Sequence, residues 1–118
     1  NKPSARQRDL AISRVIDHLN GARSSPLKMA KLCEVARVSE RTLQYAFNAR
    51  YGMSPYRFAI QWRLNSARRE LRCASRAGHS IAEVALRYGF DNPSLFAQRY
   101  RELFSELPSE TLVRPDGR

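Results

Sequence analysis

Apolar residues recur along this chain at three- and four-residue intervals, and one arrangement of them occurs twice. A shift of 52 residues aligns two apolar sets, Met29, Leu32, Cys33, Ala36 and Val38 with Ile81, Val84, Ala85, Tyr88 and Phe90. One extra residue in the second copy makes the offset 53 and aligns Leu43, Phe47, Tyr51 and Pro55 with Phe96, Tyr100, Phe104 and Pro108. Each copy predicts two short amphipathic helices joined by a tight turn, which is the layout of a helix-turn-helix.

Capping signals predict where the helices of the first half begin and end. Ser4 and Gln7 have capping-box spacing, and the apolar face that follows them ends at Asn20-Gly21. Ser25-Pro26 has the cap-and-proline form of a helix start, so we expect a second helix from there to about Arg37.

Two further helices follow from similar signals. We expect one helix over 40–51, with Ser39 as its N-cap and Gly52 at its end. Ser54-Pro55 then opens the longest helix, which is expected to reach about Cys73 and to span roughly 28 Å.

The second copy of the repeat carries its own cap and turn residues. We expect a loop over 74–79, a capping box formed by Ser80 and Glu83, and a permissive turn residue at Gly89. The remaining expectations are Asp91 or Asn92 as the cap of a helix from about Pro93 to Phe104, a short turn opened by Pro108-Ser109, and a frayed tail over Arg114–Arg118.

The charge balance indicates a polyanionic partner. The chain has 21 basic and 11 acidic residues, a net charge of +10 and a pI near 10.6, which suits nucleic acid or an anionic membrane surface. Of the 21 basic residues 18 are arginine, an excess that genome composition alone can produce. No apolar run approaches the roughly 20 residues of a membrane span, and nothing resembles a signal peptide.

No residue pattern supports catalysis, a metal site or a cofactor. Cys33 and Cys73 lie 40 residues apart with no Cys or His at ligand spacing, so we expect reduced thiols and no zinc. His18 and His79 are isolated, and neither a Gly-rich phosphate loop nor a nucleophile–base pair is present. We therefore expect a non-enzyme without a cofactor. Because the chain begins without Met, we also expect it to be a piece of a longer protein.

The second helix of each copy predicts a polar stripe opposite its apolar face. Successive residues of a helix are rotated by about 100°. The side opposite the apolar face at Leu43, Phe47 and Tyr51 therefore carries Arg41, Gln44, Tyr45 and Asn48. In the second copy the same geometry exposes Ser94, Ala97, Gln98 and Arg101. Arg suits guanine, Gln and Asn suit adenine, and Ala suits the thymine methyl, so these eight residues are candidate DNA base contacts. Any solvated helix face carries Arg and Gln, but the pairing of a stripe with a tight turn, twice, favours DNA.

Residues outside the stripes supply candidate phosphate contacts. The stretch 37–72 holds eight arginines against two glutamates, and such a basic stretch suits the DNA backbone. We expect phosphate contacts from Ser39, Arg57 and Asn92. Arg63 instead lies beside an apolar strip, so we expect it to have a structural role, paired with an acidic group or a carbonyl.

These segments resemble the AraC/XylS family of regulators over about residues 10–112. The first motif of the family is similar to Val38–Phe47 with Gly52–Pro55, and the second, more diagnostic motif is similar to Ser80–Phe90 with Phe96 and Tyr100. Arg63-Leu64 and Ala67 match the connecting helix. The resemblance implies two helix-turn-helix units joined by a long helix, reading successive major-groove turns on one DNA face. It also implies a bacterial transcription factor, usually an activator, with a separate effector-binding or dimerisation domain.

Three positions depart from the family pattern without challenging the fold. Arg37 replaces a small turn residue, and Thr111 stands where the closing motif often has Tyr. Gln98 stands where the family often has Arg, so there are two alternatives: the second recognition helix binds DNA more weakly, or it prefers a different base.

We therefore expect an all-α domain of about seven helices, with a first helix-turn-helix subdomain over about 6–52, a connector helix over about 54–73, and a second subdomain over about 80–113. The expected function is sequence-specific binding of double-stranded DNA at a non-palindromic site spanning two major-groove turns, activating bacterial transcription in the cytoplasm at the nucleoid. The expected partners are DNA, RNA polymerase and a missing N-terminal effector or dimerisation domain, with no membrane. The alternative is a basic helical adaptor that docks RNA polymerase or another acidic protein and contacts DNA only nonspecifically.

Overall fold

The computed structural model describes residues 2–77 and 80–112, which fall into two compact units. Unit 1 comprises the described residues up to Ile60 apart from Arg23–Ser25, and unit 2 comprises those three residues together with the described residues from Gln61 onwards. Each unit is considered by itself below.

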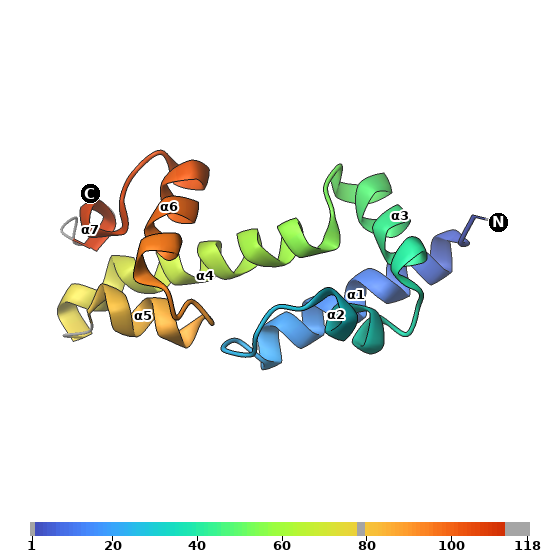
Figure 1. Ribbon diagram of the computed structural model, residues 1–118, viewed down its shortest axis with the longest axis horizontal. Helices are drawn as coiled ribbons and strands as arrows, with labels where there is room; N and C mark the ends of the chain where they lie inside the picture. The colour runs from blue at the N-terminus through green and yellow to red at the C-terminus, as the bar shows by residue number, and fades with distance from the viewer. Residues whose placement is uncertain (1, 78–79, 113–118) are drawn as a thin grey trace. The chain divides into compact units, whose positions relative to one another are not determined.

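The described residues form seven helices and no strand, which confirms the all-α expectation (Figure 1). In chain order they are α1 (Ala5–Gly21), α2 (Met29–Ala36), α3 (Glu40–Tyr51), α4 (Pro55–Ala77), α5 (Ile81–Arg87), α6 (Pro93–Phe104) and α7 (Pro108–Leu112). The expected bounds of α3 and α6 and the expected starts of α4 and α7 are confirmed.

In unit 1, α1 packs against both α2 and α3. The buried core includes Ala11, Ile12, Val15 and Leu19 of α1, Leu32 and Ala36 of α2, Leu43, Ala46 and Phe47 of α3, and Ala59 of α4. At the end of α3, the ring of Phe58 lies 5.1 Å from that of Phe47 and 4.6 Å from that of Tyr51, centroid to centroid. The aromatic contacts attach the first turn of α4 to unit 1.

In unit 2, the buried residues come from α4, α5, α6 and α7 and from the turn between α5 and α6. Its apolar core includes Leu64, Ala67, Leu71, Val84, Ala85, Phe96 and Tyr100. Arg63 of α4 is also buried, with only 2% of its surface exposed, and this burial supports the structural role expected for it. A Cβ built on Gly89 would lie 2.4 Å from Nη1 of Arg63, so the guanidinium occupies the space beside this turn.

The sequence repeat is also a repeat of backbone conformation. Arg37 follows α2 with a φ of 61°, and Gly89, 52 residues later, follows α5 with a φ of 85°. Gly52 ends α3 with a φ of 67°, and Ser105, 53 residues later, ends α6 with a φ of 58°. Each copy therefore needs two left-handed residues, and each supplies glycine at one of them.

The caps repeat less faithfully. Ser39 and Asn92, 53 residues apart, both accept a backbone N–H bond as the N-caps of α3 and α6, so Asn92 rather than Asp91 is the cap. Ser80 caps α5 in a reciprocal capping box with Glu83. The equivalent position before α2 is Lys28, whose side chain makes no capping bond.

Two expected helix bounds are wrong. The second helix does not open at Ser25-Pro26 but at Met29, and it ends at Ala36. A Ser-Pro pair suits a turn as readily as a helix start, and the buried face of α2 begins only beyond it. The connector helix does not end near Cys73 but continues to Ala77, because three of the four residues over 74–77 are the good helix formers Ala and Arg and none is a helix breaker. The rest of the expected loop, 78–79, and the expected frayed tail lie outside the described residues.

Alanine substitutions at three glycines separate backbone strain from steric overlap. Gly21→Ala should leave stability unchanged or raise it by about 0.5 kcal/mol, because Ala favours helix. Gly52→Ala should cost about 1 kcal/mol, because its φ is positive although its surroundings are open. Gly89→Ala should cost about 2 kcal/mol or more, because the new Cβ also meets Arg63. Urea unfolding measures all three, and equal losses at Gly52 and Gly89 would contradict the steric argument.

Candidate nucleic-acid interface

In unit 1, the turn between α2 and α3 holds α3 with one face outward. Ser39 accepts the backbone N–H of Thr42 at 3.2 Å, and its hydroxyl donates to Oγ1 of Thr42 at 3.1 Å. Leu43 and Phe47 are buried on the inner face. The start and the rotation of α3 are thus set together by a cap and a core contact.

The structure brings the four candidate base contacts of α3 together on its outer side. Arg41 and Asn48 are exposed, and Gln44 and Tyr45 are half-buried. The amide Nδ2 of Asn48 donates one of its two N–H groups to the backbone oxygen of Gln44 at 2.8 Å, and the second N–H and Oδ1 are the groups that would bind a base.

Arg8 of α1 reaches the same stripe, which no pattern along the sequence indicates. Its guanidinium carbon lies 5.6 Å from the centre of the Tyr45 ring, which is the range of a cation–π contact. This contact joins residues 37 positions apart, so only the packing of α1 on α3 creates it.

In unit 2, α6 presents the equivalent stripe. Ser94, Gln98 and Arg101 are exposed and Ala97 is half-buried, while Phe96 and Tyr100 are buried on the opposite side. The rings of Phe90, Phe96, Tyr100 and Phe104 form a series of neighbouring pairs 4.7 to 5.7 Å apart along this buried side. The core of unit 2 therefore orients α6 as the core of unit 1 orients α3.

The three candidate phosphate contacts differ in which of their polar groups are still available to bind a phosphate. The hydroxyl of Ser39 is already engaged as donor and acceptor within the turn. Asn92 caps α6 through Oδ1, which accepts the N–H of Leu95 at 3.1 Å, and its Nδ2 is the group that would donate to a phosphate. Arg57 lies exposed in the first turn of α4, and its backbone N–H donates to the Ser54 hydroxyl at 3.2 Å. Among the three, Arg57 has the full charge suited to a phosphate.

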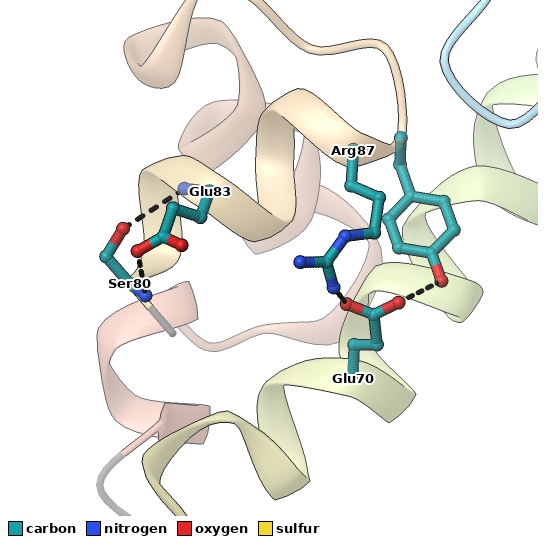
Figure 2. Close-up of polar contacts among 5 residues, drawn as sticks. Glu70, Ser80, Glu83 and Arg87 are labelled. Atoms are coloured by element: carbon teal, nitrogen blue, oxygen red, sulfur yellow. Dashed lines mark hydrogen bonds and ion pairs between the residues drawn. The ribbon is translucent and has the colours of Figure 1, made fainter. Parts of the chain in front are cut away.

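A polar cluster attaches α5 to α4 in unit 2. The carboxylate of Glu70 lies against the guanidinium of Arg87 and accepts a hydrogen bond from the Tyr88 hydroxyl at 2.7 Å (Figure 2). At the start of α5, Ser80 and Glu83 face each other and exchange two bonds of 3.1 Å (Figure 2). Burial, followed by the bond to the Glu70 carboxylate, raises the pKa of the Tyr88 phenol. Both ends of α5 are therefore held by side chains.

A second cluster holds the end of α6 against α7. The hydroxyls of Tyr100 and Thr111 lie 2.6 Å apart, and Thr111 also donates to the carboxylate of Glu106. Arg68 of α4 lies 3.7 Å from Glu106 and 4.6 Å from the centre of the Phe104 ring. Thr111, one of the departures from the family pattern, is therefore a buried hydrogen-bonding partner of α6.

The part of the chain that the structure describes contains no group of acidic, Cys and His side chains arranged to hold a metal ion. Among the described helices, none is both long and apolar enough to cross a membrane. What the fold provides is two helix-turn-helix units with an outward polar stripe on the second helix of each, which defines a helix-turn-helix protein of the nucleic-acid-binding class.

Comparison with known proteins agrees with this class. Residues 32–114 match the helix-turn-helix domain family. The chain is 34% identical to the XylDLEGF operon transcriptional activator of Pseudomonas putida over 102 residues, which are 86% of this chain and 32% of that protein. It is also 34% identical to the probable thc operon regulatory protein of Rhodococcus erythropolis over 97 residues, 82% of this chain and 29% of that protein.

Solved structures show the same fold. A probable AraC family transcriptional regulator from Rhodopseudomonas palustris CGA009 is 34% identical, with a TM-score of 0.74 over 88% of this chain and 95% of that one. An AraC-type regulator from Chromobacterium violaceum is 26% identical, with a TM-score of 0.79 over 88% and 90% of the two chains.

The chain belongs to the AraC/XylS family of transcriptional regulators and has its helix-turn-helix DNA-binding domain. This family is one of transcription regulators rather than enzymes. The chain spans about a third of the length of the first curated relatives it matches.

Tyr88→Phe should lower stability in a pH-dependent way. At pH 7 the variant loses the bond to Glu70, which should cost about 1–2 kcal/mol. The folded-state pKa of Tyr88 is raised above the unfolded value of about 10, so the stability it contributes is present below that pH and is lost as the pH rises through the folded pKa. The deficit of the variant should therefore shrink in urea unfolding above pH 10. Tyr56→Phe, at an exposed tyrosine, is the control, and a deficit independent of pH would contradict the assignment.

Proposed function

We propose that this domain binds double-stranded DNA in a sequence-specific way, with α3 and α6 in adjacent major grooves, and that it activates bacterial transcription as part of a longer regulator. The observation that carries the proposal is the equivalence of the two stripes. Four outward positions of α3 recur 53 residues later on α6, each opposite a buried aromatic face.

The side chains of the stripes have the donors and acceptors that base edges require. Arg41 and Arg101 suit the O6 and N7 acceptors of guanine, and Gln44 and Gln98 suit the paired donor and acceptor of adenine. At the third equivalent pair, Tyr45 of α3 corresponds to Gln98 of α6, so the two helices do not present identical groups. This asymmetry favours a non-palindromic site for one domain.

Activation is supported by the relatives. The similar protein of Pseudomonas putida is a transcriptional activator of the XylDLEGF operon. The aligned 102 residues are 32% of that protein, so the proposal includes a separate effector or dimerisation domain. It also includes a contact with RNA polymerase and action at the bacterial nucleoid.

Selection of bound sites from random double-stranded DNA tests the proposal. The expected result is one asymmetric consensus with two half-sites about 10 base pairs apart, corresponding to one turn of DNA. Inserting five base pairs between the half-sites should abolish tight binding, because the second half-site rotates to the far side of the duplex. Equal competition by scrambled DNA would instead favour the adaptor that contacts DNA nonspecifically.

Arg41→Ala should weaken binding to the selected site by about 1–3 kcal/mol and relax the base preference at one position. Arg50→Ala is the matched control, because it removes the same charge from the opposite side of α3, where Arg50 pairs with Asp9 at 3.4 Å. Fluorescence anisotropy on a panel of single-base variants measures both effects. If Arg41→Ala weakened binding equally on every DNA sequence, Arg41 would be reassigned as a phosphate contact.

Arg57→Ala should weaken binding to selected and scrambled DNA alike, because Arg57 is assigned to a phosphate. If the domain neutralises about 5–8 phosphates, log K against log salt has a slope of roughly −5 to −7, and the variant should flatten it by about one unit. Titrations between 50 and 300 mM salt measure the slope, with Arg50→Ala as the reference. A changed base preference at an unchanged slope would show that Arg57 reads sequence.

A further inference from the structure

The turn of unit 1 holds an arginine in a conformation that favours glycine. Arg37 has a φ of 61° and a ψ of 36°, and its backbone N–H donates to the oxygens of Cys33 at 2.9 Å and Glu34 at 3.3 Å. A side chain with a Cβ is strained in this left-handed region, and glycine is not. Unit 2 builds the equivalent turn with Gly89, so the fold itself has no need of arginine here.

The charge of Arg37 is not used within the part of the chain that the structure describes. Its side chain is exposed, and none of the described acidic groups lies within ion-pair distance of it. Glu34, the nearest acidic residue before it, pairs with Lys31 at 3.0 Å. Two other arginines of unit 1 do have partners, since Arg14 donates to the backbone oxygen of Ala36 at 3.2 Å and Arg50 lies 3.4 Å from Asp9.

The position of Arg37 on the chain points to DNA. It stands two residues before Ser39, the N-cap of α3, and four residues before Arg41, where the outward stripe begins. If α3 enters a major groove, the turn that leads into it passes the phosphates at the edge of that groove. A guanidinium suits a phosphate because it offers paired donors with a fixed charge.

We propose that Arg37 is a phosphate-binding residue of this domain, kept at a cost to the stability of unit 1. This inference rests on the proposed function, which it extends by one contact. It also means that only unit 1 has a phosphate contact at this turn, since the equivalent Gly89 of unit 2 has no side chain to bind a phosphate. Unit 1 therefore supplies more of the sequence-independent affinity at this turn than unit 2 does.

Substitutions at Arg37 should move stability and DNA binding in opposite directions. Arg37→Gly and Arg37→Asn both relieve the strain and remove the charge, so each should raise Tm by about 3–5 °C, with the glycine variant at the upper end. Each should weaken binding to selected and scrambled DNA about threefold to tenfold and flatten the salt slope by about 0.9. Arg37→Lys keeps both the charge and the strain, so its slope and Tm should stay close to those of the parent.

The outcomes separate this inference from the proposed function. Arg50→Ala removes one charge from α3 away from the stripe, so it should leave the salt slope unchanged. If it altered the slope as much as Arg37→Gly does, the effect would be one of overall charge, and the inference would be overturned. An unchanged slope in both Arg37→Gly and Arg37→Asn would also overturn it, and so would a changed base preference. If the parent domain shows no sequence preference, the proposed function fails, while the slopes still decide the role of Arg37.

Discussion

The burial of one aromatic face on α3 and on α6 is the constraint on which the rest of this domain depends. Phe47 and Phe96 have no exposed surface, and each is the anchor of a series of ring contacts. A helix whose apolar side is buried in this way cannot rotate without exposing large rings to water, at a cost of roughly 1.5–3 kcal/mol per ring. The polar stripes face outward because the aromatic sides are held inward.

The two turns meet the same backbone requirement with different residues. Each copy places a left-handed residue after its first helix and another after its second, and the chain supplies Arg37 and Gly89 at the first, Gly52 and Ser105 at the second. The turn of unit 2 is closed around the buried Arg63, which leaves no room for a side chain at Gly89. The turn of unit 1 leaves Arg37 exposed, so this position is free to contribute a charge to the surface.

Helices α2 and α5, the first of each pair, are stabilised in different ways. Helix α5 has seven residues, and polar side chains hold both ends, through the capping box at Ser80 and the Glu70 carboxylate beside Arg87. Helix α2 has no capping side chain at Lys28 and depends instead on its packing against α1 and α3. Short helices are marginal alone, so each needs one of these supports.

The sequence by itself determined those features that depend on residues close together along the chain. The caps at Ser4, Ser39 and Ser80, the apolar faces and the stripes opposite them all follow from spacings of three or four residues. The start of α2 was predicted wrongly because a Ser-Pro pair suits a turn as readily as a helix start. The end of α4 was predicted wrongly because nothing over 74–77 breaks the helix. The roles of the individual stripe residues toward DNA stay predictions.

Only the tertiary structure decided the contacts between residues distant along the chain. Arg8 meets Tyr45, Glu70 joins Arg87 and Tyr88, and Arg63 fills the space beside Gly89, over separations of 17 to 37 residues. No local periodicity encodes such pairs, because each arises where the faces of two packed helices meet. At Arg37 the sequence indicated a turn, but the left-handed backbone and the exposed side chain were decided by the structure, because this turn forms only where α2 and α3 pack together.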